Sequence, residues 1–516
     1  MGIYILDKHW ALTVEMLCFK NQKSTLSIKG ELILKLINGM KPHANLINSD
    51  LAPVSGEKKN WTWWAYAAIW MGIVHNIVAW EVAANLMAVG MSFWQAFACV
   101  ISAYLVAFLA IAFNSYSGAK YGVPFPVLIR ASFGTKGAII PVGIRAILGI
   151  FWFGVHMYIG SMAVNVILAS SFPAWDSLGD INILGLGLNE FIAFVITFLL
   201  HALITTHGIE RIRKFETWAG PIIMVIAIGL VVWAANVAGG FGNLTSIPST
   251  ISSGEFWPTF FLGMTALLGT VATLILNISD LTRFSRSQKD HFMGQGIGMP
   301  VMFILFSLMA LLTTAGTMYA FDEPVTNPIY VLAHFENPFI VTVGAVSILI
   351  SAISVNVATN GVAVGYDLTD LAPTKLNFRK SITIALIIGA VSAPWLWYNE
   401  GGTLDMVLGA IGATMGPVLG VMLIDFFVIR KMNYDLGSLF SHKGIYGGVK
   451  KNGVIAFLVG AFAAYSGLII PPLRFLYNFN WFLGVGVSAI AYLILMWSKR
   501  TETTNFEADM NKVKHN

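Results

Sequence analysis

Long apolar runs alternate with short polar connections along most of this chain. An α-helix needs about 20 apolar residues to cross the hydrocarbon core of a bilayer. Runs close to that length occupy residues 61–89, 92–116, 139–170, 186–206, 218–239, 256–278, 293–318, 338–365, 381–398, 404–429, 454–470 and 479–498. The pattern predicts an all-α integral membrane protein with twelve transmembrane helices.

Basic residues mark every second connection between these runs. They are Lys58, Lys59, Lys120, Arg130, Lys136, Arg211, Arg213, Lys214, Arg283, Arg286, Lys289, Lys375, Arg379, Lys380, Arg430, Lys431, Lys443, Lys450, Lys451, Lys499 and Arg500. The other connections carry mostly acids, with Arg474 as the exception. Cytoplasmic loops are enriched in Lys and Arg. The alternation of basic and acidic connections therefore predicts a multi-pass protein of the plasma (inner) membrane with both termini cytoplasmic.

Composition narrows the function classes. Hydrophobic residues make up 56% of the 516 and charged residues 11%, whereas soluble domains carry about 25% charged residues. The net charge of +5 follows from the loop bias and predicts no nucleic-acid partner. Two cysteines are too few for a disulfide framework or a thiolate metal site. No ATP-binding loop and no hydrolase motif is present, so we expect no organic cofactor and an ion gradient as the energy source.

Span one carries His75 and Asn76 near its middle, just after Gly72. Polar groups in hydrocarbon need partners and mark packed interiors or a solute path. A lone intramembrane histidine is more often a helix–helix contact. The adjacent glycine and asparagine favour a second interpretation, an unwound backbone, which is tolerated only around a cavity.

Span three places Trp152 and His156 four residues apart, on one helical face. This pair is consistent with interface packing. It equally suits a planar polar heterocycle, which would stack on the indole and bond to the imidazole.

Span six contains Gly263 and Gly269, followed by Thr270 and Val271. These glycines indicate either a second helix break or close helix packing. Interrupted helices at matching places in two halves are typical of transporters built from inverted five-helix repeats.

Span eight includes the polar stretch SAISVNVATN, residues 351–360. Ser351, Ser354 and Val355 share one helical face, while Asn356 and Asn360 lie on another. Polar groups on both sides predict a helix in the centre of the bundle. Lone acids elsewhere are expected near helix ends and are candidates for a proton path: Glu81, Glu190, Glu216, Asp405 and Asp425.

Three segments carry a family resemblance: YGVPFPVLIRASFG at 121–134, NISDLTRF at 277–284 and GPVLGVMLIDFF at 416–427. With them the chain, from about Met40 to Arg500, resembles the nucleobase–cation symporter-1 family. Members of that family carry hydantoins, allantoin, cytosine, uracil and purines. The resemblance implies the broken-helix, inverted-repeat fold shared with sodium-coupled amino-acid transporters, with breaks in helices one and six.

The implied organisation divides the chain into five parts. They are a cytoplasmic tail at 1–57, a first five-helix repeat at 58–239, a second repeat at 256–429, two peripheral helices at 452–500 and a cytoplasmic tail at 501–516. Residues 1–39 are either part of the native tail or an extension upstream of a natural start at Met40.

The resemblance also implies a substrate site. Trp152 falls where the family stacks an indole on the substrate ring, and His156 where an amide often binds the ring's edge. Asn76 and Asn360 match polar substrate contacts. Thr270 and Val271 fall at the expected break in span six, and relatives often have a Trp in place of Val271.

For the coupling ion, the resemblance implies backbone carbonyls of Gly72, His75 and Ser351 with the hydroxyl of Ser354. Val355 stands where sodium-coupled relatives have a Thr. A hard cation such as Na⁺ is expected to want about five or six oxygens, so the missing hydroxyl weakens a sodium site. His75 places a titratable group beside this position, and histidine as a residue type changes charge near physiological pH, so the coupling ion is expected to be H⁺ or loosely bound Na⁺.

The leading interpretation is a monomeric secondary transporter that imports a small heterocycle. A same-fold importer of another solute, such as a vitamin precursor, is the main alternative. A membrane-embedded enzyme is disfavoured because His75, His156 and His201 lack the spacing of a ligand cluster. A channel is disfavoured because the polar patches are confined to mid-span.

Overall fold

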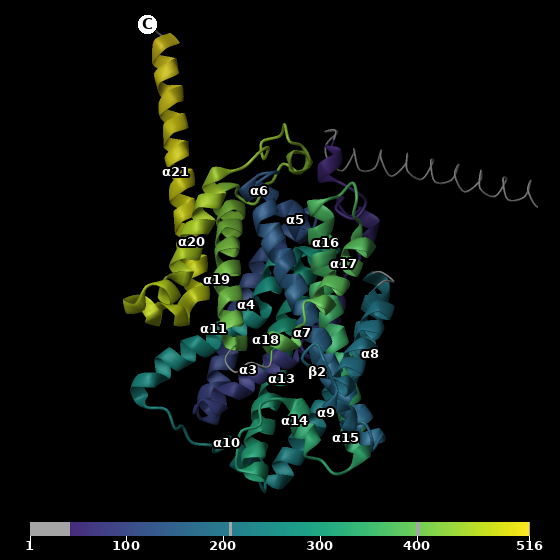
Figure 1. The fold of residues 1–516 in the computed structure, drawn as a ribbon. Coiled ribbons are helices and arrows are strands. Elements are labelled where there is room, and N and C mark those ends of the chain that lie inside the picture. The colour runs from purple at the N-terminus through teal and green to yellow at the C-terminus, as the bar shows by residue number, and fades with distance from the viewer. Residues whose placement is uncertain (1–41, 206–208, 399–402, 515–516) are drawn as a thin grey trace, which may run out of the picture.

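The computed structural model describes residues 42–205, 209–398 and 403–514, and it is almost entirely helical. Long helices run side by side in one bundle, and α21 extends beyond it at one end (Figure 1). The long helices are α4 (Phe93–Tyr121), α7 (Ile139–Ser171), α8 (Leu188–Thr205), α9 (Ile209–Val237), α11 (Ser253–Asn277), α13 (Gln288–Phe321), α15 (Pro338–Val355), α19 (Thr403–Leu423), α20 (Lys451–Ile469) and α21 (Asn480–Lys514).

Shorter elements connect and complete these helices. They are α2 (Trp63–Ile73), α3 (Ile77–Ala88), α5 (Phe125–Leu128), α6 (Arg130–Phe133), α10 (Phe241–Thr245), α12 (Ser279–Thr282), α14 (Pro328–Ala333), α16 (Val362–Leu371), α17 (Phe378–Val391), α18 (Trp395–Tyr398), and a hairpin of β1 (Asn182–Ile183) and β2 (Leu186–Gly187).

Within the described ranges, nine helices are long and apolar enough to cross a bilayer. The pair α2 and α3 makes a tenth span, bent by 64° at its break. The two further spans of the predicted twelve are α17, which has only 14 residues, and α9, whose described apolar stretch is Ile223–Val237. About ten spans are thus evident, and the count of twelve stays a prediction.

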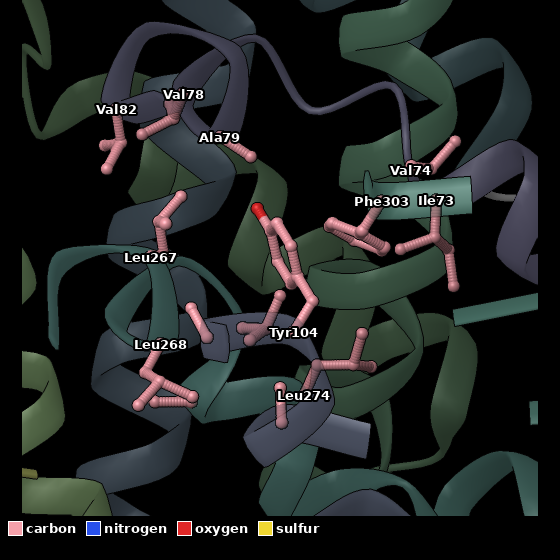
Figure 2. Close-up of a cluster of buried hydrophobic side chains, with 14 of the residues drawn as sticks. Ile73, Val74, Val78, Ala79, Val82, Tyr104, Leu267, Leu268, Leu274 and Phe303 are labelled. Carbon is pink, nitrogen blue, oxygen red and sulfur yellow. The ribbon is translucent and has the colours of Figure 1, made fainter. Parts of the chain in front are cut away.

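Helix one is interrupted at residues 74–76, the place that its glycine and polar pair indicated. Asn76 has extended backbone angles (φ −77°, ψ 112°) and caps α3, because its side chain accepts from the Val78 N–H at 2.9 Å. The break is packed with apolar side chains: Tyr104 of α4, Leu267 of α11 and Phe303 of α13 surround it (Figure 2). Such contacts hold membrane helices together through van der Waals packing.

The break expected in span six is absent, and that prediction was wrong. Helix α11 runs unbroken from Ser253 to Asn277. Its glycines serve close packing instead: a Cβ on Gly263 would lie 2.5 Å from Leu86 Cδ2, and one on Gly269 would lie 2.7 Å from the Leu408 carbonyl oxygen. Thr270 Oγ1 donates to the Leu267 carbonyl at 2.6 Å, a bond along an intact helix.

Span eight is irregular at the polar stretch. Helix α15 ends at Val355, a π-helical turn covers Asn356–Gly361, and α16 continues from Val362. π-helical turns inside helices are rare and frequent at functional sites.

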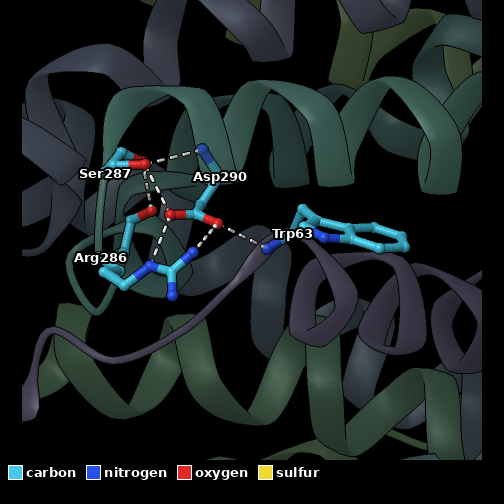
Figure 3. A network of polar contacts seen from close by, with 5 residues as sticks. Trp63, Arg286, Ser287 and Asp290 are labelled. Atoms are coloured by element: carbon cyan, nitrogen blue, oxygen red, sulfur yellow. Dashed lines mark hydrogen bonds and ion pairs between the residues drawn. The ribbon is translucent and has the colours of Figure 1, made fainter.

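The starts of helices one and seven are tied together by the carboxylate of Asp290. It accepts from the Ser287 hydroxyl at 2.6 Å, from two Arg286 nitrogens at 3.0 Å and from the Trp63 backbone N–H at 3.2 Å (Figure 3). This network fixes the start of α2 beside the start of α13. The first half of the broken helix one is therefore anchored to helix seven.

Candidate functional site

A small cavity of about 20 Å³ lies at the break in helix one. Its lining residues are Ile73, Asn76, Trp152, His156, Thr270, Val271, Thr273, Leu274, Phe303, Val355, Thr359 and Asn360. All six residues that the sequence predicted for the substrate site are among them. Five segments far apart in the chain therefore converge on one point.

Trp152 and His156 form one wall of this cavity. Their ring centroids are 5.8 Å apart with an interplanar angle of 31°, and both side chains are buried. Trp152 Nε1 and His156 Nδ1 meet no hydrogen-bond partner among the described residues. A buried polar atom without a partner costs about 1–3 kcal/mol, so this wall is suited to a ligand that supplies the missing bonds.

The asparagines of the polar stretch have distinct partners. Asn360 Nδ2 donates to Asn356 Oδ1 at 3.1 Å, and Asn356 Nδ2 donates to the Phe153 carbonyl at 3.0 Å. Asn356 thus holds span eight against span three and bonds to Asn360, which lines the cavity. Asn76 uses its Oδ1 as the cap of α3, which leaves its NH₂ group as the donor toward a ligand.

The volume indicates a closed conformation. About 20 Å³ accommodates roughly one water molecule, which is too little for any heterocycle. Phe303 and Ile73 narrow the space from the side of helices seven and one. Substrate entry therefore requires these helices to move apart from α7.

The four predicted cation residues also come together. Ser351 Oγ donates to the His75 carbonyl, and Ser354 Oγ donates to the Gly72 carbonyl at 3.4 Å. The Gly72 and His75 carbonyls and the Ser351 and Ser354 hydroxyls thus lie together between the broken helix and α15, and oxygens are the ligands that hard cations prefer. For Ser351 the resemblance implied the backbone carbonyl, whereas the oxygen that meets the His75 carbonyl is its hydroxyl. Val355 adds no oxygen and lines the neighbouring cavity instead. The His75 ring is buried, with its centroid 5.2 Å from that of Phe306.

Sequence reasoning missed several lining residues. Phe303 and Leu274 are apolar residues in apolar helices, and no local signal distinguishes them from core residues. Thr359 lies in the polar stretch and was a recognisable candidate; its hydroxyl donates to the Val355 carbonyl at 2.7 Å. Among the lone acids, Glu216 and Asp405 have side chains outside the described residues.

Glu81 bridges three elements at the end of the bundle opposite the basic loops. Its carboxylate accepts from Asn327 Nδ2 at the start of α14 and from the Tyr398 hydroxyl of α18 at 2.8 Å. The Tyr398 ring lies 5.8 Å from that of Tyr158 on α7. Glu81 therefore ties α3 to α14 and α18.

The segment NISDLTRF has a structural role. Asp280 accepts from the Phe125 backbone N–H at 2.8 Å and from Asn277 Nδ2 at 2.9 Å. Arg283 donates to the Asp50 carbonyl at 2.8 Å. These bonds join the end of span six to the loop before span three and to the N-terminal segment.

Comparison with known proteins agrees with this geometry. Residues 53–486 match the family model described as permease for cytosine/purines, uracil, thiamine, allantoin. An allantoin permease of Bacillus subtilis is 39% identical over 90% of this chain and 96% of its own length. A purine-uracil permease, NCS1, of Arabidopsis thaliana is 32% identical over 77% of this chain and 66% of its own.

Among solved structures, the fold is similar to that of MHP1, a nucleobase-cation-symport-1 family transporter, in a closed conformation with bromovinylhydantoin bound. The TM-score is 0.74 at 20% identity, over 88% of this chain and 96% of that one. A Na⁺-coupled sialic acid symporter shares the fold more distantly, with a TM-score of 0.57 at 14% identity, over 91% of this chain and 95% of that one.

The fold and the buried site together define a multi-pass membrane permease, not an enzyme. Within that class, the chain belongs to the nucleobase–cation symporter-1 family, the permeases for cytosine/purines, uracil, thiamine and allantoin.

Proposed function

We propose that this permease imports a hydantoin-like compound or a nucleobase by symport with a cation. The observation that carries the proposal is the wall formed by Trp152 and His156: both residues line one cavity at a helix break, and each has a buried ring nitrogen without a partner among the described residues. Allantoin is the foremost candidate, because the B. subtilis allantoin permease is similar to this chain over nearly the full length of both proteins.

In this proposal the substrate ring stacks on the Trp152 indole. Offset stacking of aromatic planes is worth about 0.5–1.5 kcal/mol beyond the buried area. His156 bonds to the ring's edge through whichever donor or acceptor the ligand offers, while the amides of Asn76 and Asn360 bind its exocyclic groups. Val271, smaller than the Trp often found there in relatives, leaves room beside Thr270.

Transport follows from alternating access. The cavity opens to one side of the membrane, closes around the substrate and opens to the other side. The break in helix one places backbone polar groups beside the cavity, so ion and substrate are bound by the same moving element.

The coupling ion is H⁺ or Na⁺. Gly72, His75, Ser351 and Ser354 supply four oxygens, fewer than the five or six that Na⁺ is inferred to need by analogy with other hard cations. His75 stands beside this set as a titratable group. Uptake that requires sodium at fixed pH and is indifferent to a protonophore would contradict proton coupling.

The experiment that tests the substrate is a thermal-shift panel on the purified protein. Allantoin, hydantoin, uracil, cytosine and hypoxanthine are compared with and without NaCl, and thiamine represents the alternative of a vitamin-type solute. A ligand that binds the folded state alone raises its stability by RT ln(1 + [L]/Kd). The proposal expects a shift from at least one planar heterocycle, and a panel without any shift contradicts it.

A further inference from the structure

A second cavity, much larger than the first, opens far from the substrate site. It has a volume of about 450 Å³ and lies between the loop after span ten and the ends of α20 and α21. Its walls include Arg430, Ile445, Val449, Lys450, Lys451 and Met496. This is the end of the bundle that carries the basic loops, at the top of Figure 1.

Three cationic side chains line this cavity, and a buried acid beside it, Asp425, engages only one of them. The Arg430 Nε lies 3.4 Å from Asp425 Oδ1, and Asp425 is also bonded by the Tyr492 hydroxyl at 2.7 Å. Within the described part of the chain, Lys450 and Lys451 form no ion pair. Helix α20 begins at Lys451, so the positive end of its dipole adds to the same field. The cavity is therefore suited to an anion.

The surroundings of the cavity are apolar. Ile445 and Val449 at its mouth are 56% and 52% exposed. From there, exposed apolar side chains continue along the two peripheral helices, with Leu458 and Phe462 on α20 and Ile494 and Trp497 on α21. A basic pocket beside exposed apolar side chains matches a molecule with an anionic head and a hydrocarbon tail.

We propose that this cavity binds the headgroup of an anionic phospholipid. The lipid phosphate accepts from the ammonium groups of Lys450 and Lys451, and the acyl chains lie against α20 and α21. Basic pockets between transmembrane helices on the cytoplasmic side bind such headgroups by the same chemistry. A bound lipid would hold α20 and α21 to the end of span ten, where the Tyr492 hydroxyl already joins α21 to Asp425. The proposal is independent of the transported solute.

The test uses the full-length protein purified in a neutral detergent. Phosphatidylglycerol, phosphatidylcholine and inorganic phosphate are added separately, and the readouts are the melting temperature and the number of lipids retained in native mass spectrometry. The test variant is Lys450→Gln with Lys451→Gln. Its matched control is Lys375→Gln with Lys380→Gln, which removes two exposed lysines from another part of the same face.

We expect phosphatidylglycerol, but not phosphatidylcholine, to raise the melting temperature and to be retained. A basic residue near an anionic lipid strengthens binding about fivefold, so the test variant should bind roughly 25-fold more weakly and the control at nearly wild-type strength. Equal losses in both variants would reduce the effect to general surface charge and overturn the proposal. A full effect from inorganic phosphate alone would make this a free-anion site and would overturn it too.

Discussion

Trp152 is the residue on which the proposed substrate site most depends. Its indole is 3% exposed and forms a wall of the cavity with an unpartnered nitrogen. Replacing it removes both a stacking plane and a donor, whereas a surface tryptophan contributes neither.

We therefore predict that Trp152→Ala raises the dissociation constant of the preferred heterocycle by about tenfold or more, from lost stacking and hydrogen bonding. Isothermal titration calorimetry measures it. The matched control is Trp257→Ala, since Trp257 is 59% exposed and should leave binding unchanged. Equal binding by the Trp152 variant and the wild type would exclude the indole from the site.

Val355 is the position at which the proposed cation site differs from that of sodium-coupled relatives, which have a Thr there. Threonine has nearly the same shape as valine and adds one oxygen, so Val355→Thr should strengthen a sodium site. We predict that substrate binding in this variant improves about fivefold when NaCl replaces choline chloride, the lower end of typical coupling between two ligands. Val355→Ala changes size without adding an oxygen and serves as the control. An unchanged sodium response in Val355→Thr would argue against these residues as the cation site.

At the scale of elements, we expect the contact of α3 with α14 and α18 to restrain the opening of the cavity. Glu81 joins these elements through Asn327 and Tyr398. Hydrogen bonds to a charged group are worth about 1.5–3 kcal/mol. Losing one should shift the population toward a conformation open at this end.

We predict that Tyr398→Phe accelerates labelling of Thr359→Cys by a membrane-impermeant thiol reagent by about tenfold, because Thr359 lines the cavity. The background carries Cys18→Ser and Cys99→Ser. Tyr319→Phe is the control, since its hydroxyl bonds only to the Asn243 carbonyl among the described residues. A labelling rate unaffected by Tyr398→Phe would mean that Glu81 does not restrain opening.

A second contact between elements concerns stability rather than opening. Arg130 of α6 forms a buried ion pair with Asp370 of α16, with side chains 1% and 8% exposed, and also donates to the Leu439 carbonyl at 2.8 Å. Removing one partner of a buried pair leaves an uncompensated charge and costs about 3–5 kcal/mol.

Asp370→Ala should consequently lower the melting temperature of the ligand-free protein far more than Glu57→Ala, which removes an exposed acid. The double variant Arg130→Met with Asp370→Leu should recover part of the loss, because no charge is then left buried. Similar melting temperatures for Asp370→Ala and Glu57→Ala would contradict a stabilising role for this pair.

At the scale of the whole molecule, about ten of the membrane spans that the sequence predicts are also evident among the described residues, because apolar length is a local property of the chain. It also indicates the break in helix one, since Gly72, His75 and Asn76 lie within five residues of one another and all disfavour a regular, lipid-facing helix. The same kind of signal misled in span six. There Gly263 and Gly269 permit close approach of Leu86 and Leu408, and only the tertiary partners distinguish packing from unwinding.

In the candidate site too, some residues could be predicted from the sequence and others could not. Trp152 and His156 could be identified from their spacing on one face, and the resemblance extended the prediction to Asn76 and Asn360. Phe303 could not be found, because an apolar residue lining a cavity looks like any core residue in sequence. The basic pocket could not be found either, because Arg430, Lys450 and Lys451 look like ordinary loop charges in the sequence and only the fold brings them together around one cavity.

The central claim is that a planar heterocycle binds in the cavity beside Trp152 and His156. Calorimetric binding of allantoin to the wild type, His156→Gln and His156→Leu tests it most directly. The account predicts that the wild type binds, that the Gln variant, which retains a donor and an acceptor, stays within about tenfold, and that the Leu variant, which cannot bond to the ring's edge, loses more than about tenfold. Allantoin binding by His156→Leu as tight as by the wild type would contradict it.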